Sequence, residues 1–433
     1  MTSNNWFAVG LASLTCSIAG GCAMDSSSAP KPYKAEVIDH LPPTTERGEQ
    51  WLVAPRNLSL LEDIDTLQSN FFSVNLGGVI KISSNFGSLV SAELDSTSNR
   101  GRLRYTVKNG VIIPRDTSSL LALSSFYAFE RTINALKAST GLEPQSLKEK
   151  INGPFNLYFE PTILEKDGAH KSFYTIKFNA AFNSENNQFY LFRRSEIESI
   201  PFSANIKVIS HEFGHALFKT SFNQNTVENC TLPNEAELQT RREDKFFRGR
   251  WSLEYAISGL NEGFADFHSY VVTSSADIFA ELNPAIANNS RALNGIKFNF
   301  SQLGNDSACA GRFYCIGTLF ARSLYNVAKR YSNNRAELMG FSRRVYAALE
   351  KTAENMRKSP AVDIIPFANQ EALMCKRRDR PVLTYDGALT SSFLAAFLQS
   401  FTAGEEKKLL CENFTELFGT TGFAQKVRVV CEP

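Results

Sequence analysis

The sequence predicts an α+β protein, with strands gathered in its first half and helices in its second. Residues 52–114 contain β-rich runs separated by turn signals, whereas apolar residues follow helical spacing from about residue 203 onward. The two kinds of segment do not alternate regularly, which is the α+β pattern. Hydrophobic residues make up 43% and charged residues 21% of the 433 positions, which is typical of a globular chain with a substantial core.

The charge balance and the apolar runs exclude two classes of protein. Lys and Arg number 46 against 44 Asp and Glu, so the chain has no basic excess, and we expect no nucleic-acid partner. No run after residue 22 reaches the roughly 18 apolar residues of a membrane-spanning helix. We therefore expect no internal transmembrane segment.

The N-terminus has the features of an export signal. Trp6 to Gly21 is apolar or small and carries no charge, as in a signal-peptide core. The small residues that lead into Cys22 resemble a bacterial lipobox, so we expect a signal peptide over 1–21 and lipidation of Cys22. The chain would then be anchored in the bacterial envelope, on the periplasmic or cell-surface side. Ordinary cleavage near Ala23, giving a secreted protein, is the alternative.

A tether and a set of cysteines follow. Pro and Ser residues over 23–50 predict a flexible tether between the anchor and the folded body. The even number of cysteines beyond Cys22 predicts disulfides in an oxidising compartment, although free buried thiols are the alternative and the sequence does not fix the pairing. These cysteines are Cys230, Cys309, Cys315, Cys375, Cys411 and Cys431.

The folded body divides into a strand-rich region over 51–114 and a larger domain over 115–433. Asn109-Gly110 separates two β-rich runs and predicts a hairpin over 102–113. Apolar residues from Leu120 to Ile133 share one helical face and predict a helix over 117–138. Further strands are predicted at 155–159, 173–178 and 188–192, and further helices at 204–219, 252–273, 312–331, 335–357 and 388–402.

The motif that carries chemistry is His211-Glu212-Phe213-Gly214-His215, an HExxH sequence. Four residues advance a helix by about 400°, so the two histidines lie on one face and can bind one Zn²⁺. Glu212 lies beside the metal as a candidate general base. The alternative is a helix whose histidines are only packing residues.

A catalytic zinc site keeps three protein ligands, and a later helix supplies the third. Glu262 and Asp266 are four residues apart on a predicted helix over 258–273, flanked by apolar residues. Glu262 can ligate the metal while Asp266 accepts the free N–H of a ligand imidazole. His268 lies about 240° around the helix from Glu262 and is not expected to be a ligand. His40 and His170 are expected at the surface.

Together these segments resemble the zinc-binding helices of gluzincins, and specifically of thermolysin-like metallopeptidases. That family pairs HExxH with a downstream helix like Ser258 to Asp266, and an edge strand like Phe178 to Asn183 precedes both. The resemblance implies a two-lobe fold with a strand-rich N-terminal lobe, a zinc-binding helix and a mostly helical C-terminal lobe. It also implies that Asn179 and the Ala180 backbone bind substrate.

The chain departs from that family in two places. His215 and Glu262 are further apart than usual, which predicts an inserted loop over about 219–250. The family also places a histidine near its oxyanion site, but no histidine follows His268 in this sequence. Tyr314 is the nearest donor of the right kind and Tyr255 a second candidate, although either can instead be a core tyrosine.

The sequence therefore predicts a monomeric zinc endopeptidase of the envelope that acts on a peptide or protein substrate and holds one Zn²⁺. Glu212 would act as general base towards the attacking water and pass the proton to the leaving amine. The alternative is a catalytically weak or inactive zinc-bearing lipoprotein with an assembly or binding role. A third interpretation is a structural lipoprotein in which HExxH is fortuitous.

Overall fold

The computed structural model describes most of the chain between residues 32 and 431. The described ranges are 32–44, 47–85, 88–151, 153–167, 174–176, 180–183, 187–191, 200–223, 253–278, 291–295, 312–358, 388–401, 404–418 and 422–431. The predicted signal peptide, Cys22, His170, and residues 224–250 of the predicted insertion lie outside them.

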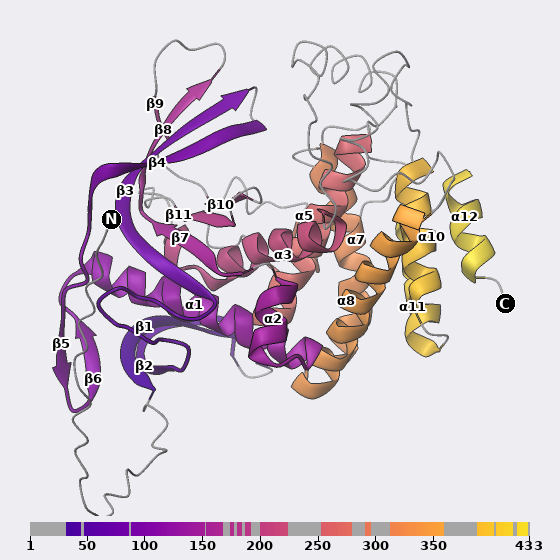
Figure 1. Cartoon of the computed structure of the whole chain (residues 1–433). Helices are drawn as coiled ribbons and strands as arrows, with labels where there is room; N and C mark the ends of the chain where they lie inside the picture. The colour runs from indigo at the N-terminus through magenta and orange to yellow at the C-terminus, as the bar shows by residue number, and fades with distance from the viewer. Residues whose placement is uncertain are drawn as a thin grey trace, which may run out of the picture.

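Two sheets form the N-terminal half (Figure 1). A four-stranded sheet has the order β2-β1-β6-β5, and a seven-stranded sheet has the order β10-β11-β7-β3-β8-β9 with β4 paired to β3. The strands are β1 (Tyr33–Leu41), β2 (Gln50–Leu58), β3 (Phe72–Asn85), β4 (Ser88–Arg100), β5 (Tyr105–Lys108), β6 (Val111–Pro114), β7 (Phe155–Phe159), β8 (Thr162–Asp167), β9 (Tyr174–Ile176), β10 (Ala180–Asn183) and β11 (Gln188–Leu191).

Strand β3 serves both parts of the larger sheet because it changes direction at two glycines. Its first residues pair in parallel with β7, and the residues from Val79 onward pair with β4 and β8. Gly77 and Gly78 have φ values of 65° and 96°, which glycine adopts without steric cost. The far part of β3, with β4, β8 and β9, consequently projects away from the body (Figure 1).

Helices make up most of the other described residues. They are α1 (Thr117–Thr140), α2 (Pro144–Lys150), α3 (Ile206–Asn223), α5 (Leu253–Thr273), α7 (Arg312–Ala328), α8 (Arg335–Lys358), α10 (Ala388–Ser400), α11 (Glu405–Phe418) and α12 (Gly422–Cys431), with short 3₁₀ turns η1 (Phe202–Ala204) and η3 (Lys329–Tyr331). The α+β prediction is confirmed, and the hairpin at Asn109-Gly110 forms between β5 and β6.

The long helix α1 has a clear start and end in the sequence. Asp116 caps it by accepting a 2.8 Å hydrogen bond from the Ser119 N–H, and Gly141 ends it with φ 69°. Its apolar face packs into a cluster of phenylalanines that also includes residues from β3, β7, β11 and α3. In this cluster the Phe129 ring lies 4.6 Å from Phe72 and 5.4 Å from Phe213. Because Phe213 lies between the two motif histidines, this core holds helix α3 against the sheet.

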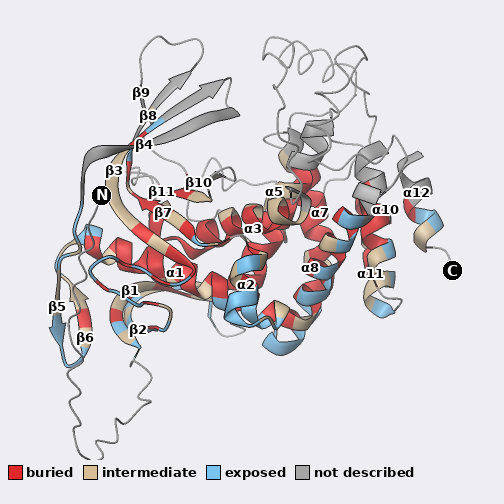
Figure 2. Ribbon diagram, in the orientation of Figure 1, coloured by how far each residue is buried: buried red, intermediate tan, exposed pale blue. Residues whose placement is uncertain are grey.

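Burial is concentrated in the central helices (Figure 2). Helices α1, α3 and α5 are buried along most of their described length, and α8 and α11 expose one face to solvent. Cys411 and Cys431 form a disulfide between α11 and α12, and Cys315 is also disulfide-bonded. Cys230, Cys309 and Cys375 lie outside the described ranges.

The predicted tether over 23–50 is wrong for Tyr33–Leu41, which forms strand β1. Ala35 and Val37 alternate with more exposed neighbours and are fully buried. The strand pairs with both β2 and β6, so it lies inside the four-stranded sheet. The prolines that suggested a tether flank the strand, where proline is tolerated.

His40 is buried rather than at the surface, because it belongs to a charged cluster that joins β1 to α3, the helix of the HExxH sequence. Its Nε2 contacts Glu49 Oε1, and its ring packs against Trp51. The fully buried Lys207 ammonium, at the start of α3, lies 3.0 Å from Glu49 Oε1 and donates to the Asp277 carbonyl. The N-terminal sheet is thus tied to the base of α3.

Within the described part of the chain, the helices are all too short or too polar to cross a membrane.

Candidate metal centre

Helix α3 begins at a capped turn and carries the two histidines on one face. The Asn205 side chain accepts a 2.9 Å hydrogen bond from the Lys207 N–H at the first turn. Ile206, Val208 and Ile209 are buried and fix the helix in the core. One turn further on, the Nε2 atoms of His211 and His215 lie 3.1 Å apart.

Helix α5 brings Glu262 to the same point. Glu262 Oε2 lies 3.4 Å from His211 Nε2, and Oε1 lies 3.7 Å from His215 Nε2. Ligand atoms about 2.0–2.1 Å from a tetrahedral zinc are separated by about 3.3 Å. The three donors therefore fit one tetrahedral zinc ion, and in the described ranges they are the group of histidine, cysteine and acidic side chains close enough to hold a metal.

Both imidazoles are oriented through their other ring nitrogen. Asp266 Oδ1 lies 2.9 Å from His211 Nδ1, and Asn261 Oδ1 lies 3.0 Å from His215 Nδ1. An oxygen acceptor at Nδ1 favours the tautomer that carries its proton there, which leaves Nε2 as the metal-binding atom. Asp266 was expected in this role, whereas Asn261 was not.

The helices that carry these groups approach one another at glycine. A Cβ atom added to Gly214 of α3 would lie 2.5 Å from Ala265 Cα of α5. A Cβ atom added to Gly263 of α5 would lie 2.2 Å from the Gly317 carbonyl oxygen of α7. Real Cβ contacts are not this short, so the spacing of α3, α5 and α7 depends on the absence of these side chains.

Arg291 adds a cation next to the acidic side of the site. Its Nη2 lies 3.0 Å from Glu262 Oε2 and 2.8 Å from Asp266 Oδ1. Its guanidinium lies over the Tyr314 ring, 4.5 Å from the ring centre, in a cation–π arrangement. Arg291 thus bridges Glu262, a candidate metal ligand, and Asp266, the carboxylate that orients His211.

The charges of these groups shift their pKa values. Burial lowers the pKa of His211, but hydrogen bonds and charge from Asp266 and Glu262 outweigh it and raise the pKa to about 9. Burial raises the pKa of Glu262, but the charges of His215, His211 and Arg291 and the His211 hydrogen bond hold it well below its usual range. Burial, together with the nearby Glu262 charge, raises the pKa of Tyr314 to about 12, so its phenol keeps its proton at neutral pH.

Of the other predicted site residues, some lie at the metal centre, some lie elsewhere and some fall outside the described residues. Tyr314 lies at the site, on the first turn of α7 and within electrostatic reach of Glu212. Ala180 is buried in β10, at the edge of the larger sheet. Asn179 and the Tyr255 side chain lie outside the described residues. His268 is buried and hydrogen-bonded to the Tyr346 hydroxyl, away from the three donors, as expected from its position on the helix.

Sequence reasoning missed Asn261 and Arg291. Asn261 directly precedes Glu262, so its position on the helix next to a ligand was a usable signal. Arg291 stands in no motif and reaches the site only through the folding of its turn.

Comparison with known proteins gives no family for this chain. No protein-family model and no curated protein matches it. Among solved structures it is similar to the precursor of protealysin, a metalloproteinase from Serratia proteamaculans, with 11% identity over 82% of this chain and 88% of that chain. The TM-score of that match is 0.31, too low to support an inference about fold or function.

Proposed function

We propose that the chain is a zinc-dependent endopeptidase that cleaves peptide bonds in a peptide or protein substrate. The observation that carries the proposal is the set of donor atoms on His211, His215 and Glu262, spaced for one tetrahedral zinc, with Glu212 beside them on α3. The thermolysin-like architecture and the export of the chain belong to the same proposal.

The residues of the site divide the work of hydrolysis. When bound, zinc would supply Lewis-acid polarisation and a lowered pKa for an attacking water. Glu212 takes the proton of that water and delivers it to the leaving amine. Asp266 and Asn261 hold the imidazoles in their metal-binding orientation, and Arg291 holds Glu262.

Tyr314 and strand β10 are assigned to the substrate. The Tyr314 phenol, protonated at neutral pH and close to Glu212 and Arg291, donates a hydrogen bond to the developing oxyanion. An extended peptide adds as a strand alongside Ala180 of β10, the edge strand of the described sheet. Asn179 next to it, and Tyr255, remain candidates on the resemblance alone.

The cellular setting is part of the proposal. Its support is the apolar N-terminal segment that ends at Cys22, together with cysteines that pair as disulfides. The protein would be a monomer, anchored by lipid at Cys22 to the bacterial envelope or, alternatively, secreted. A second candidate is a zinc-bearing lipoprotein without catalysis, which the missing oxyanion histidine favours and the retained Glu212 disfavours.

Zinc analysis and peptide cleavage on matched variants test the proposal. Wild type should bind one zinc per chain and cleave members of a peptide library. Glu212→Gln should fold, keep its zinc and lose at least about 10²-fold in kcat, because the amide cannot accept the proton. Glu337→Gln, an exposed residue on α8, is the control and should match wild type.

The alternatives predict different results. A protein that binds zinc but cleaves no peptide would support the non-catalytic lipoprotein. A protein that binds no zinc would overturn the metal centre. Cleavage by Glu212→Gln at the wild-type rate would exclude Glu212 as the base.

A further inference from the structure

Residues 291–295 form a short turn between α5 and α7 that carries Arg291 into the metal centre. Two backbone hydrogen bonds shape it, from the Leu293 N–H to the Ala276 carbonyl (2.8 Å) and from the Gly295 N–H to the Ala292 carbonyl (3.0 Å). The Leu293 side chain is buried beneath it. Because Arg291 stands at the start of this turn, the path of the turn's backbone decides where its guanidinium can reach.

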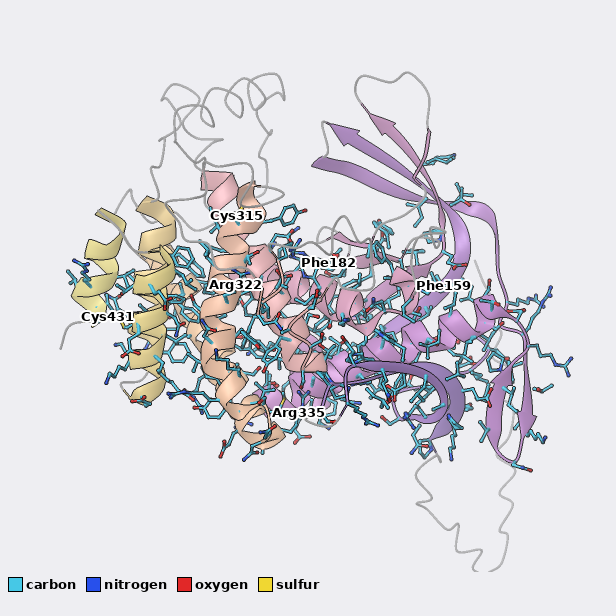
Figure 3. The ribbon with its side chains drawn as sticks, turned by 180° about the vertical axis from the view of Figure 1, so that it is seen from behind. Phe159, Phe182, Cys315, Arg322, Arg335 and Cys431 are labelled. Carbon is cyan, nitrogen blue, oxygen red and sulfur yellow. A yellow bond between two sulfur atoms is a disulfide. The ribbon has the colours of Figure 1, made fainter. Side chains whose placement is uncertain are left out.

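A second arginine, Arg322 of α7, holds the turn at the peptide between Ala292 and Leu293. Its Nε and Nη2 donate to the Ala292 carbonyl oxygen at 3.1 Å and 2.8 Å. Arg322 is only 4% exposed, and it lies within the helical part of the molecule (Figure 3). A Cβ atom added to Gly295 would lie 3.2 Å from its Nη2, so the guanidinium is packed directly against the turn.

The geometry of this contact restricts the turn more than a single hydrogen bond does. Two donors of one planar, rigid group fix both the distance and the direction of the Ala292 carbonyl. Burial lowers the pKa of Arg322 to about 10, so the group still carries its charge at neutral pH and its bonds to the carbonyl are charge-assisted.

Helix α7 therefore contacts Arg291 in two ways. Tyr314, on its first turn, lies beneath the Arg291 guanidinium, and Arg322 holds the backbone that follows Arg291. Eight residues advance the helix by about 12 Å and by about 80° beyond two full turns, so both side chains leave it within the same half of its surface. Helix α7 thus contacts both the Arg291 side chain and the backbone of the turn that carries it.

We propose that Arg322 is a positioning residue of the metal centre, which sets Arg291 against Glu262 and Asp266. Among the described residues its hydrogen bonds go to the Ala292 carbonyl and not to the three donors, so it acts through the backbone of the turn. The inference rests on the proposed function only for the measurements of zinc affinity, because amide exchange of the turn can be measured without zinc.

The test compares Arg322→Gln with a matched control, Arg335→Gln. Arg335 also donates from its guanidinium to backbone carbonyls, those of Val271 and Val272, but it is an exposed residue and lies at the lower edge of the helices in Figure 3, below Arg322. Arg322→Gln should make amide exchange at Leu293 and Gly295 at least about tenfold faster. It should also weaken zinc binding about tenfold, as substitutions behind metal ligands do. Arg335→Gln should change neither.

A double-variant comparison separates positioning from general stability. Because Arg322 acts through Arg291, adding Arg322→Gln to the Arg291→Gln variant should weaken zinc binding no further. Adding Arg335→Gln should leave zinc binding unchanged both in wild type and in the Arg291→Gln variant. Arg322→Lys keeps the charge but offers no planar fork, so it should restore part of the zinc affinity. It also serves if the glutamine variant does not fold.

Three results would overturn or confine the proposal. Wild-type exchange at Leu293 and Gly295 in Arg322→Gln would show that Arg322 does not hold the turn. Faster exchange with unchanged zinc affinity would show that the turn is held but that Arg291 does not depend on it, which refutes the positioning role. If wild type binds no zinc, the proposed function fails, and the exchange of the two amides still decides whether Arg322 fixes the turn.

Discussion

Substitution of Gly263 by alanine is a direct test of how the candidate metal centre is assembled. Gly263 follows Glu262 on α5 and faces Gly317 on α7. An added Cβ would lie 2.2 Å from the Gly317 carbonyl oxygen and 2.8 Å from the Gly317 carbonyl carbon. These are backbone atoms, which cannot turn aside as the end of a flexible side chain can. The two helices must therefore separate by about 1 Å to reach an ordinary contact distance.

The structure gives the size of both effects. Overpacking of this kind costs up to about 3 kcal/mol, and alanine gains about 1 kcal/mol over glycine in helix propensity, so we expect a net loss of about 2 kcal/mol in unfolding free energy. The metal centre should suffer as well, because Glu262 moves with the helix. Metal–ligand distances tolerate only about 0.2 Å of change, so a 1 Å shift should weaken zinc binding by at least about tenfold.

Denaturant unfolding of the metal-free protein and zinc competition titration measure the two effects separately. Gly340→Ala on α8 is the matched control, because the nearest atom to its added Cβ is the end of the Arg344 side chain at 3.6 Å. That variant should be up to about 1 kcal/mol more stable than wild type and bind zinc normally. If Gly263→Ala resembles Gly340→Ala in both measurements, the close approach of α5 and α7 does not set the site.

Three further predictions concern other parts of the molecule. Glu49→Ala leaves the buried Lys207 ammonium without its carboxylate, so unfolding free energy should fall by roughly 3 kcal/mol in denaturant titration, and a Glu49→Leu/Lys207→Met pair should recover much of it. Burial and the nearby His211 charge lower the pKa of His268 to about 3, so the unfolded chain binds more protons as pH falls below about 6.5. Stability is therefore lost from pH 6.5 downward, by about 2 kcal/mol at pH 5, and stability–pH curves of His268→Gln should lack this slope. Tyr314→Phe should lower kcat about 10²–10³-fold with KM and melting temperature unchanged, whereas lost stability with unchanged kcat would mean that the phenol only packs.

Local signals carried the parts of the fold that were predicted well. Asn109-Gly110 needs no distant contact to turn the chain, and φ values of 53° and 75° at these residues fit the expected hairpin. The HExxH spacing likewise fixes the two histidines through helix geometry alone. Glu262 and Asp266 could be paired with the histidines because a catalytic zinc needs a third ligand, and acidic side chains among apolar residues need a cationic or metal partner.

The parts that were missed depend on contacts between distant segments. Strand β1 is buried because β2 and β6 lie on either side of it, and its flanking prolines suggested a tether. His40 is buried because Glu49 and Trp51 surround it. Arg291 reaches Glu262 only because a turn held from α7 aims it there. The surroundings of His40 and of Arg291 have no sequence period or spacing of their own.

The contacts by which α7 supports the metal-ligand residues also have a consequence for biosynthesis. The three donor residues are translated before α7, whereas the glycine contact at Gly317 and the hydrogen bonds from Arg322 come from α7 itself. A nascent chain that ends ahead of α7 would carry the complete ligand set on helices without their support. High-affinity zinc capture should then begin only after α7 has been made, which delays the proposed hydrolytic activity until more than three quarters of the polypeptide, through Ala328, has been synthesised.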